Sequence, residues 1–122
     1  MNNKVETAHS RMVNNLAKQG EDILKDLTPH TAELLHMAIL LAGEAGELVD
    51  CIKKHAIYTK KLDFDNLEEE LGDIEFSLER IRQLTGVTRE ETLEANIKKL
   101  AKRYDGSYSN ESAQIRLDKI GA

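Results

Sequence analysis

Residues 28–52 read TPHTAELLHMAILLAGEAGELVDCI, and this stretch predicts the longest helix of the chain. Thr28 is a good N-cap, and Pro29 suits the first helical position, where its missing N–H costs nothing. The apolar residues of one helix face recur at three- and four-residue spacing: Leu34, Ala38, Leu41, Ala45, Leu48 and Ile52. We therefore expect one long helix that begins at Pro29 and ends near Tyr58.

Helical spacing of apolar residues continues on both sides of this stretch. It predicts one helix over about residues 5–18 and another that Asp63 or Asp65 caps and Gly86 stops. A capping box at Thr88 predicts a further helix toward Tyr104.

The polar end of the chain predicts one last short helix around residues 111–119, with Ser109 as its cap. No segment has the alternating pattern of a strand. The expected fold is therefore all-α, a four-helix bundle in a single domain over residues 1–122. Its core is expected over about residues 5–104, with a C-terminal tail over 105–122.

Composition narrows the function classes. The net charge of the 122 residues is −5, which argues against nucleic acid as a partner because such partners call for a basic face. No apolar run reaches the ~18 residues of a membrane span, and the N-terminus lacks the apolar region of a secretory signal. Cys51 is the only cysteine, so no disulfide framework is expected and a reducing cytoplasm is the predicted compartment.

Two pairs of acids lie beside the apolar faces of the second and third predicted helices. Glu44 and Glu47 are three residues apart, as are Glu70 and Asp73, so each pair shares one helix face. A short turn should make the two helices antiparallel neighbours. Reflection about residue 61 places Asp73 opposite Asp50 and brings the two acid pairs within about one helical turn, ~5 Å.

Four carboxylates at that range need a counter-ion, and hard divalent cations such as Mg²⁺ or Mn²⁺ are the natural one. A solvated acidic face explains the spacing equally well, because the chain has 22 acids. Two observations favour the metal site. The leading acid of each pair borders an apolar face, and Gly43 and Gly46 bracket Glu44, which suggests close approach by a ligand or another helix.

The acid-rich blocks LAGEAGEL (41–48) and ELGD (70–73) resemble the ExxE…ExxD signature of the MazG-like all-α nucleoside triphosphate pyrophosphohydrolases. Dimeric dUTPases and phosphoribosyl-ATP pyrophosphohydrolases belong to the same superfamily. A third block, ANIKKLAKRY (95–104), looks like the nucleotide-contacting helix of that family. The resemblance spans roughly residues 30–118.

The resemblance implies a role for each matching residue. Glu44, Glu47, Glu70 and Asp73 would hold Mg²⁺ or Mn²⁺, and Asp50 is a further candidate because Gly43 stands where some members carry an extra Glu. Glu47, with Glu44, would be catalytic and would orient or deprotonate the attacking water. Lys99 and Arg103 would meet phosphates, and Asn96 and Tyr104 would contact sugar or phosphate.

The implied reaction is attack at the α-phosphate, which releases pyrophosphate from a nucleoside triphosphate. A deoxynucleotide is the expected substrate, and a purine such as dGTP or dATP is a guess that no residue supports. A dUTPase-like activity is the alternative within the superfamily. The family also implies a homodimer or homotetramer.

Two other classes compete with this reading. A di-iron carboxylate bundle needs two Glu-x-x-His motifs, and Glu6–His9 and Glu33–His36 supply them. Glu33, however, lies 11 residues before Glu44, or ~16 Å along the helix, which is the wrong level for one site. The second competitor is a non-enzymatic helical module whose apolar faces bind partner helices.

Overall fold

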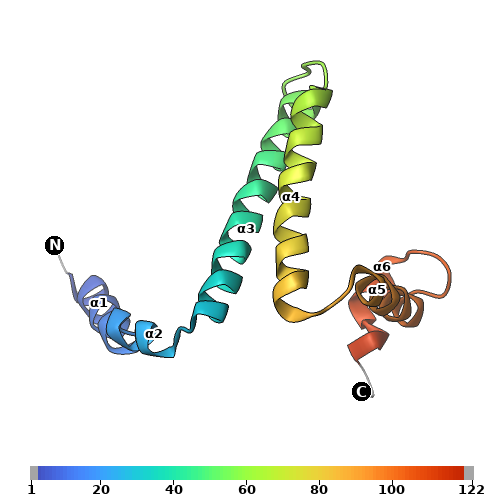
Figure 1. Ribbon diagram of the computed structural model, residues 1–122. Coiled ribbons are helices and arrows are strands. Elements are labelled where there is room, and N and C mark those ends of the chain that lie inside the picture. The colour runs from blue at the N-terminus through green and yellow to red at the C-terminus, as the bar shows by residue number, and fades with distance from the viewer. Residues whose placement is uncertain (1–2, 120–122) are drawn as a thin grey trace. The chain divides into compact units, whose positions relative to one another are not determined.

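The computed structural model describes residues 3–119. Within that range the chain forms helices and connecting segments and no strand, which confirms the predicted all-α class (Figure 1). The chain divides into two compact units, Met1–His36 and Met37–Ala122. The assignment of the chain to a single domain stays a prediction. None of the helices in the described range combines the length and the apolarity that a membrane span requires.

The first unit contains α1, Lys4–Leu16, and α2, Gly20–Asp26. The spacing of apolar residues predicted α1 to within two residues at each end, but it did not predict α2. That helix has only seven residues, and no side chain caps its N-terminus. Lys18, two residues before α2, forms an ion pair with Asp26, the last residue of the helix, and this contact supports the helix.

Helix α3, Pro29–Ala56, is the long helix expected from the sequence. Thr28 caps it as predicted, because the Thr31 N–H donates to the Thr28 hydroxyl at 3.1 Å and the Thr28 N–H donates back to the Thr31 hydroxyl at 2.9 Å. The helix ends two residues before Tyr58. Thr59 follows with a φ of 55°, a left-handed conformation that turns the chain.

Helix α4, Phe64–Thr85, runs antiparallel to α3, and the two lie side by side (Figure 1). Asp63 is its cap, since its carboxylate accepts the Asn66 N–H at 3.1 Å. Gly86 ends the helix with a φ of 76°, which confirms the predicted left-handed stop. Ser77, 1% exposed, and Cys51, 4% exposed, are the most buried residues of this hairpin.

Helix α5, Arg89–Arg103, begins with the predicted capping box. The Glu91 N–H donates to the Thr88 hydroxyl at 3.1 Å, and the Thr88 N–H donates to the Glu91 carboxylate at 3.2 Å. The chain then turns and forms α6, Asn110–Ile115, and a 3-10 turn, η1, over Leu117–Lys119.

The last helix is shorter than predicted. Ser109 caps it as expected, accepting the Ser112 N–H at 3.0 Å. The helix nevertheless stops at Ile115, because Arg116 is left-handed with a φ of 53° and the chain changes to 3-10 geometry. This break points η1 back onto α5, where Asp118 meets Arg103.

Candidate functional site

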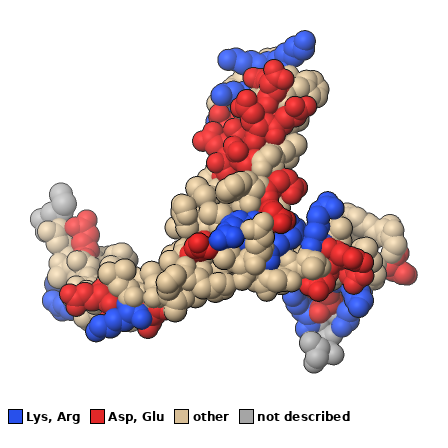
Figure 2. Space-filling model, in the orientation of Figure 1, with Lys and Arg blue, Asp and Glu red and all other residues tan. Residues whose placement is uncertain are grey.

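Three carboxylates meet on the α3–α4 hairpin. Glu44 of α3 and Glu70 and Asp73 of α4 each offer an oxygen, and the three oxygens lie within 4.8 Å of one another. Among residues 3–119 this is the one such group of His, Cys, Asp and Glu side chains. Figure 2 shows Asp and Glu side chains gathered over the same hairpin. We call Glu44, Glu70 and Asp73 the acid cluster.

The helices position the cluster from both sides. Glu70 and Asp73 are three residues apart on α4, so their side chains project from one face. Glu44 projects from the facing side of α3. Glu44 and Glu70 are half-buried and Asp73 is exposed, so the cluster is partly covered by the protein and open to solvent at Asp73.

Glu70 is the most perturbed acid of the cluster. Burial raises its pKa above the ordinary value, and a hydrogen bond with Glu44 raises it further, as do the charges of Glu44, Glu47 and Asp73. Its Oε2 atom is buried and has no hydrogen-bond partner within the described part of the chain. A buried, unpartnered carboxylate oxygen beside two more carboxylates fits a hard divalent cation, which prefers oxygen ligands.

Glu47 and Asp50 lie outside this cluster. Glu47 is exposed, yet its charge acts on Glu70, so it borders the site. Asp50 pairs with lysines of its own helix, Lys54 at 3.0 Å and Lys53 at 3.7 Å. The hydrogen bond and charge of Lys54 lower the pKa of Asp50.

The predicted register of the hairpin is wrong. Reflection about residue 61 placed Asp73 opposite Asp50, whereas the structure places Asp73 beside Glu44. The reason is that α4 begins alongside Cys51, whose sulfur lies 4.0 Å from the carbonyl oxygen of Asp63. Each α4 residue therefore lies beside an α3 residue that is farther from the turn than the one a symmetric hairpin would predict.

Gly43 and Gly46 do not mark a close approach of another helix within residues 3–119. A Cβ atom at either position would meet no atom within 4 Å beyond its chain neighbours and the nearby backbone of its own helix. The backbone beside Glu44 is therefore open, and packing within the described chain does not explain the two glycines.

The predicted nucleotide-contacting residues lie on α5 and at its end. Asn96 and Lys99 are exposed. Arg103 is half-buried and donates from Nε to Asp118 Oδ1 at 2.9 Å and from Nη2 to Asp118 Oδ2 at 3.3 Å. Sequence reasoning did not single out Asp118, because its partner is 15 residues away across a turn and no periodicity connects the two.

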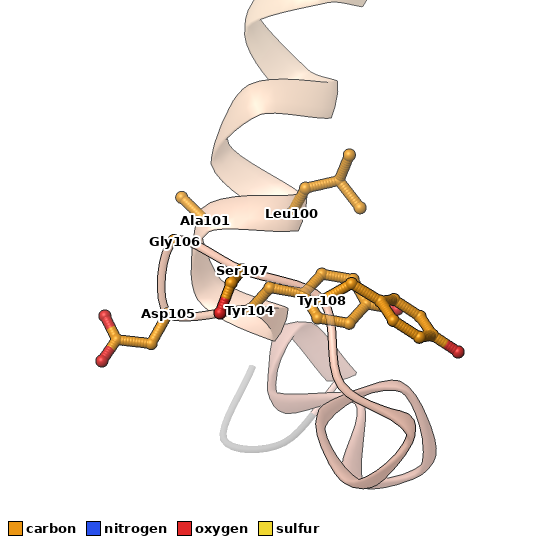
Figure 3. A pocket seen from close by; sticks show the side chains of 7 residues that line it. All are labelled: Leu100, Ala101, Tyr104, Asp105, Gly106, Ser107 and Tyr108. Atoms are coloured by element: carbon orange, nitrogen blue, oxygen red, sulfur yellow. The ribbon is translucent and has the colours of Figure 1, made fainter.

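A pocket of about 450 Å³ lies at the C-terminal end of α5 (Figure 3). Tyr104 and Tyr108 line it, and their ring centroids are 5.4 Å apart at an interplanar angle of 38°. The Tyr108 hydroxyl hydrogen-bonds Asn110 Oδ1 at 2.7 Å, which holds that ring in place. Two aromatic rings in an open pocket offer surface on which a flat group can stack.

The fold and the acid cluster together define an all-α protein with a candidate divalent-cation site on a helix hairpin. The MazG nucleotide pyrophosphohydrolase domain matches residues 32–107, which is more than half of the chain, so the chain belongs to the MazG family. The matched region contains the acid cluster and every predicted site residue, but not Asp118. No curated protein and no solved structure shows significant similarity to the chain.

Proposed function

We propose that the protein hydrolyses a nucleoside triphosphate, in particular a deoxynucleoside triphosphate, to the monophosphate and pyrophosphate with the help of Mg²⁺ or Mn²⁺. The family supports nucleotide pyrophosphohydrolase activity in general. The observation that carries the metal-dependent form of the proposal is the acid cluster, where Glu70 has a buried oxygen with no partner.

Glu44, Glu70 and Asp73 are the residues that hold the cation in this proposal. When bound, a divalent cation neutralises phosphate charge and lowers the pKa of a bound water. Glu47 is exposed and its charge acts on Glu70, which supports the proposal that it accepts the proton of the attacking water. The water oxygen forms a bond to the α-phosphorus, and the bond from that phosphorus to the bridging oxygen breaks and releases pyrophosphate.

The cations of α5 supply the phosphate contacts. Lys99 and Arg103 are four residues apart on one face of the helix, and Asn96 and Tyr104 complete a polar edge for sugar or phosphate. Lys offers a point charge and Arg a two-pronged donor for phosphate oxygens. We also propose that this polar edge and the acid cluster form one site, either within one subunit or between two subunits.

The assembly we propose is a homodimer or homotetramer. Helix α3 carries Val49 and Ile52, and Ile57 follows directly after it; all three are exposed, and Val49 is 64% accessible. With Leu48, Lys53 and Ala56 they line one pocket. An apolar row of this kind on a small helical chain fits a self-complementary interface, and two-fold dimers are the commonest outcome. A cytoplasmic location, without nucleic-acid or membrane partners, stays a prediction.

The test is turnover of each common NTP and dNTP, and of dUTP, with Mg²⁺ or Mn²⁺, followed by identification of the products. The proposal expects a monophosphate and pyrophosphate in equal amounts. In ¹⁸O-labelled water the label should enter the monophosphate, because the water attacks the α-phosphorus. Orthophosphate as the product, or label in pyrophosphate, would contradict the reaction. No turnover with any nucleotide would favour a non-enzymatic helical module.

A further inference from the structure

The C-terminal segment joins α5 through one buried ion pair. The side chain of Arg103 is 15% exposed and that of Asp118 is 5% exposed. Each charge shifts the other, so the pKa of Arg103 is raised and that of Asp118 is lowered, mainly by the hydrogen bond between them. Lys119 adds a weaker contact to Asp118 at 3.8 Å.

The contact with Asp118 occupies one edge of the Arg103 guanidinium. Arginine has five N–H groups, and the contact with Asp118 uses one on Nε and one on Nη2. The two Nη1 hydrogens and the second Nη2 hydrogen are not used in this contact. That remaining edge has the two-pronged shape that matches two oxygens of a phosphate.

We propose that Asp118 is a positioning residue, which holds the Arg103 guanidinium so that its remaining edge faces the pyrophosphate part of the substrate. The inference rests on the proposed function. Asp118 does not touch the substrate. It fixes the rotamer of a long, flexible side chain before the substrate arrives. The Arg103 side chain therefore loses its conformational entropy when the protein folds and not when the substrate binds.

The alternative is that the pair only clamps the C-terminal segment onto α5. Both ideas predict some loss of stability when the pair is broken, so stability alone does not separate them. They differ in what they predict for substrate binding. A positioning role predicts weaker binding of the phosphate groups, and it predicts that removal of Asp118 has no effect once Arg103 can no longer make the two-pronged contact.

A double-mutant cycle separates the two ideas. Asp118→Asn keeps the size and removes the charge, and Arg103→Lys keeps a charge and removes the planar edge. We expect Asp118→Asn to raise KM roughly tenfold, as for loss of a charge-assisted hydrogen bond, with kcat little changed. The double variant should have the KM of Arg103→Lys alone. Glu111→Gln, which removes an exposed acid from the same segment, is the control and should leave KM unchanged.

A direct binding measurement keeps this inference distinct from the proposed reaction. Calorimetric titration with magnesium pyrophosphate should show the same order of affinities: wild type and Glu111→Gln tight, and Asp118→Asn, Arg103→Lys and the double variant weak. A wild type that binds pyrophosphate but hydrolyses no nucleotide would contradict the reaction and leave the inference standing. Absence of pyrophosphate binding in the wild type would overturn the inference.

Circular dichroism establishes that each variant is folded. If Asp118→Asn loses helical signal, Asp118→Ser, which also removes the charge but keeps a small polar side chain, takes its place in the same cycle. An unchanged KM and pyrophosphate affinity in the Asp118 variant would overturn the positioning role. So would additive effects of the Asp118 and Arg103 changes, because independent effects mean that Asp118 does not act through Arg103.

Discussion

A carboxylate oxygen of Glu70 in α4 lies within 4.8 Å of a carboxylate oxygen of Glu44 in α3, so two acids of consecutive helices meet side by side. Two ionised carboxylates at this range repel each other, which favours a proton on one of them. Burial raises the pKa of Glu70, and the neighbouring Glu44 raises it further. Without a cation the acid cluster therefore lowers the stability of the fold, and a bound cation would remove this destabilisation.

Replacement of Glu70 by Gln should stabilise the protein without metal. Because the pKa of Glu70 is raised in the folded state, its ionised form destabilises the fold, and a neutral amide removes that effect. Thermal unfolding in EDTA should give a higher melting temperature for Glu70→Gln than for the wild type. In Mg²⁺ the order should reverse, because only the wild type gains stability from the ion.

Glu68→Gln is the matched control for this change, since Glu68 is an exposed acid of the same helix two residues away. It should behave as the wild type in both buffers. A drop in the melting temperature of Glu70→Gln in EDTA would show that the Glu44–Glu70 contact stabilises the fold and that the acid cluster is not strained.

Metal binding should release protons at any pH where Glu70 is partly protonated. Glu70 must be ionised to serve as a ligand, and its raised pKa means that protons compete with the cation at a higher pH than at an ordinary glutamate. Mg²⁺ affinity should therefore weaken as the pH falls toward the raised pKa. Calorimetry in buffers of different ionisation enthalpy measures the number of protons released. Affinity that is constant down to the ordinary glutamate pKa would exclude Glu70 as a ligand.

Replacement of Asp50 by Asn should leave metal affinity unchanged. The Asp50 carboxylate is held by Lys54 and Lys53 on its own helix, and the lowered pKa reflects that pairing. Titration with Mn²⁺, followed by its paramagnetic effect on water relaxation, gives the affinity of each variant. A marked loss of affinity in Asp50→Asn would place Asp50 among the ligands and would mean that the lysine contacts break when metal binds.

The capping box of α5 should contribute measurably to stability. Thr88→Ala removes the hydroxyl that accepts the Glu91 N–H, and loss of such a cap typically costs ~1 kcal/mol. Thr88→Ser keeps the hydroxyl and should remain close to the wild type. Urea unfolding of both variants gives the comparison, and equal midpoints for Ala and Ser would mean that the cap contributes nothing.

A charge on the apolar row of α3 should dissociate the proposed oligomer. Val49 is exposed in the single chain, so Val49→Glu should not disturb the hairpin itself. At an interface between copies, the same change would bury a charge without a partner. Sedimentation velocity should show a larger species for the wild type and a monomer for the variant. A wild type that sediments as a monomer at micromolar concentration would contradict the proposal.

The sequence by itself determined the ends of the main helices and the identity of the acids. Thr28, Asp63, Gly86, and Thr88 with Glu91 act within one helical turn, so their effect can be read from neighbouring residues. The short helix α2 escaped prediction because it lacks such a cap. The i,i+3 spacing of Glu70 and Asp73 likewise predicts a shared face without reference to the rest of the chain.

Only the tertiary structure decided which of these groups meet. Sequence periodicity says nothing about how far one helix slides along another, and the contact of Cys51 with the start of α4 sets that offset. The offset brings Glu70 and Asp73 to Glu44 and leaves Asp50 with its lysines. The ion pair of Arg103 with Asp118 likewise depends on the left-handed turn at Arg116, since it joins side chains that no local rule relates.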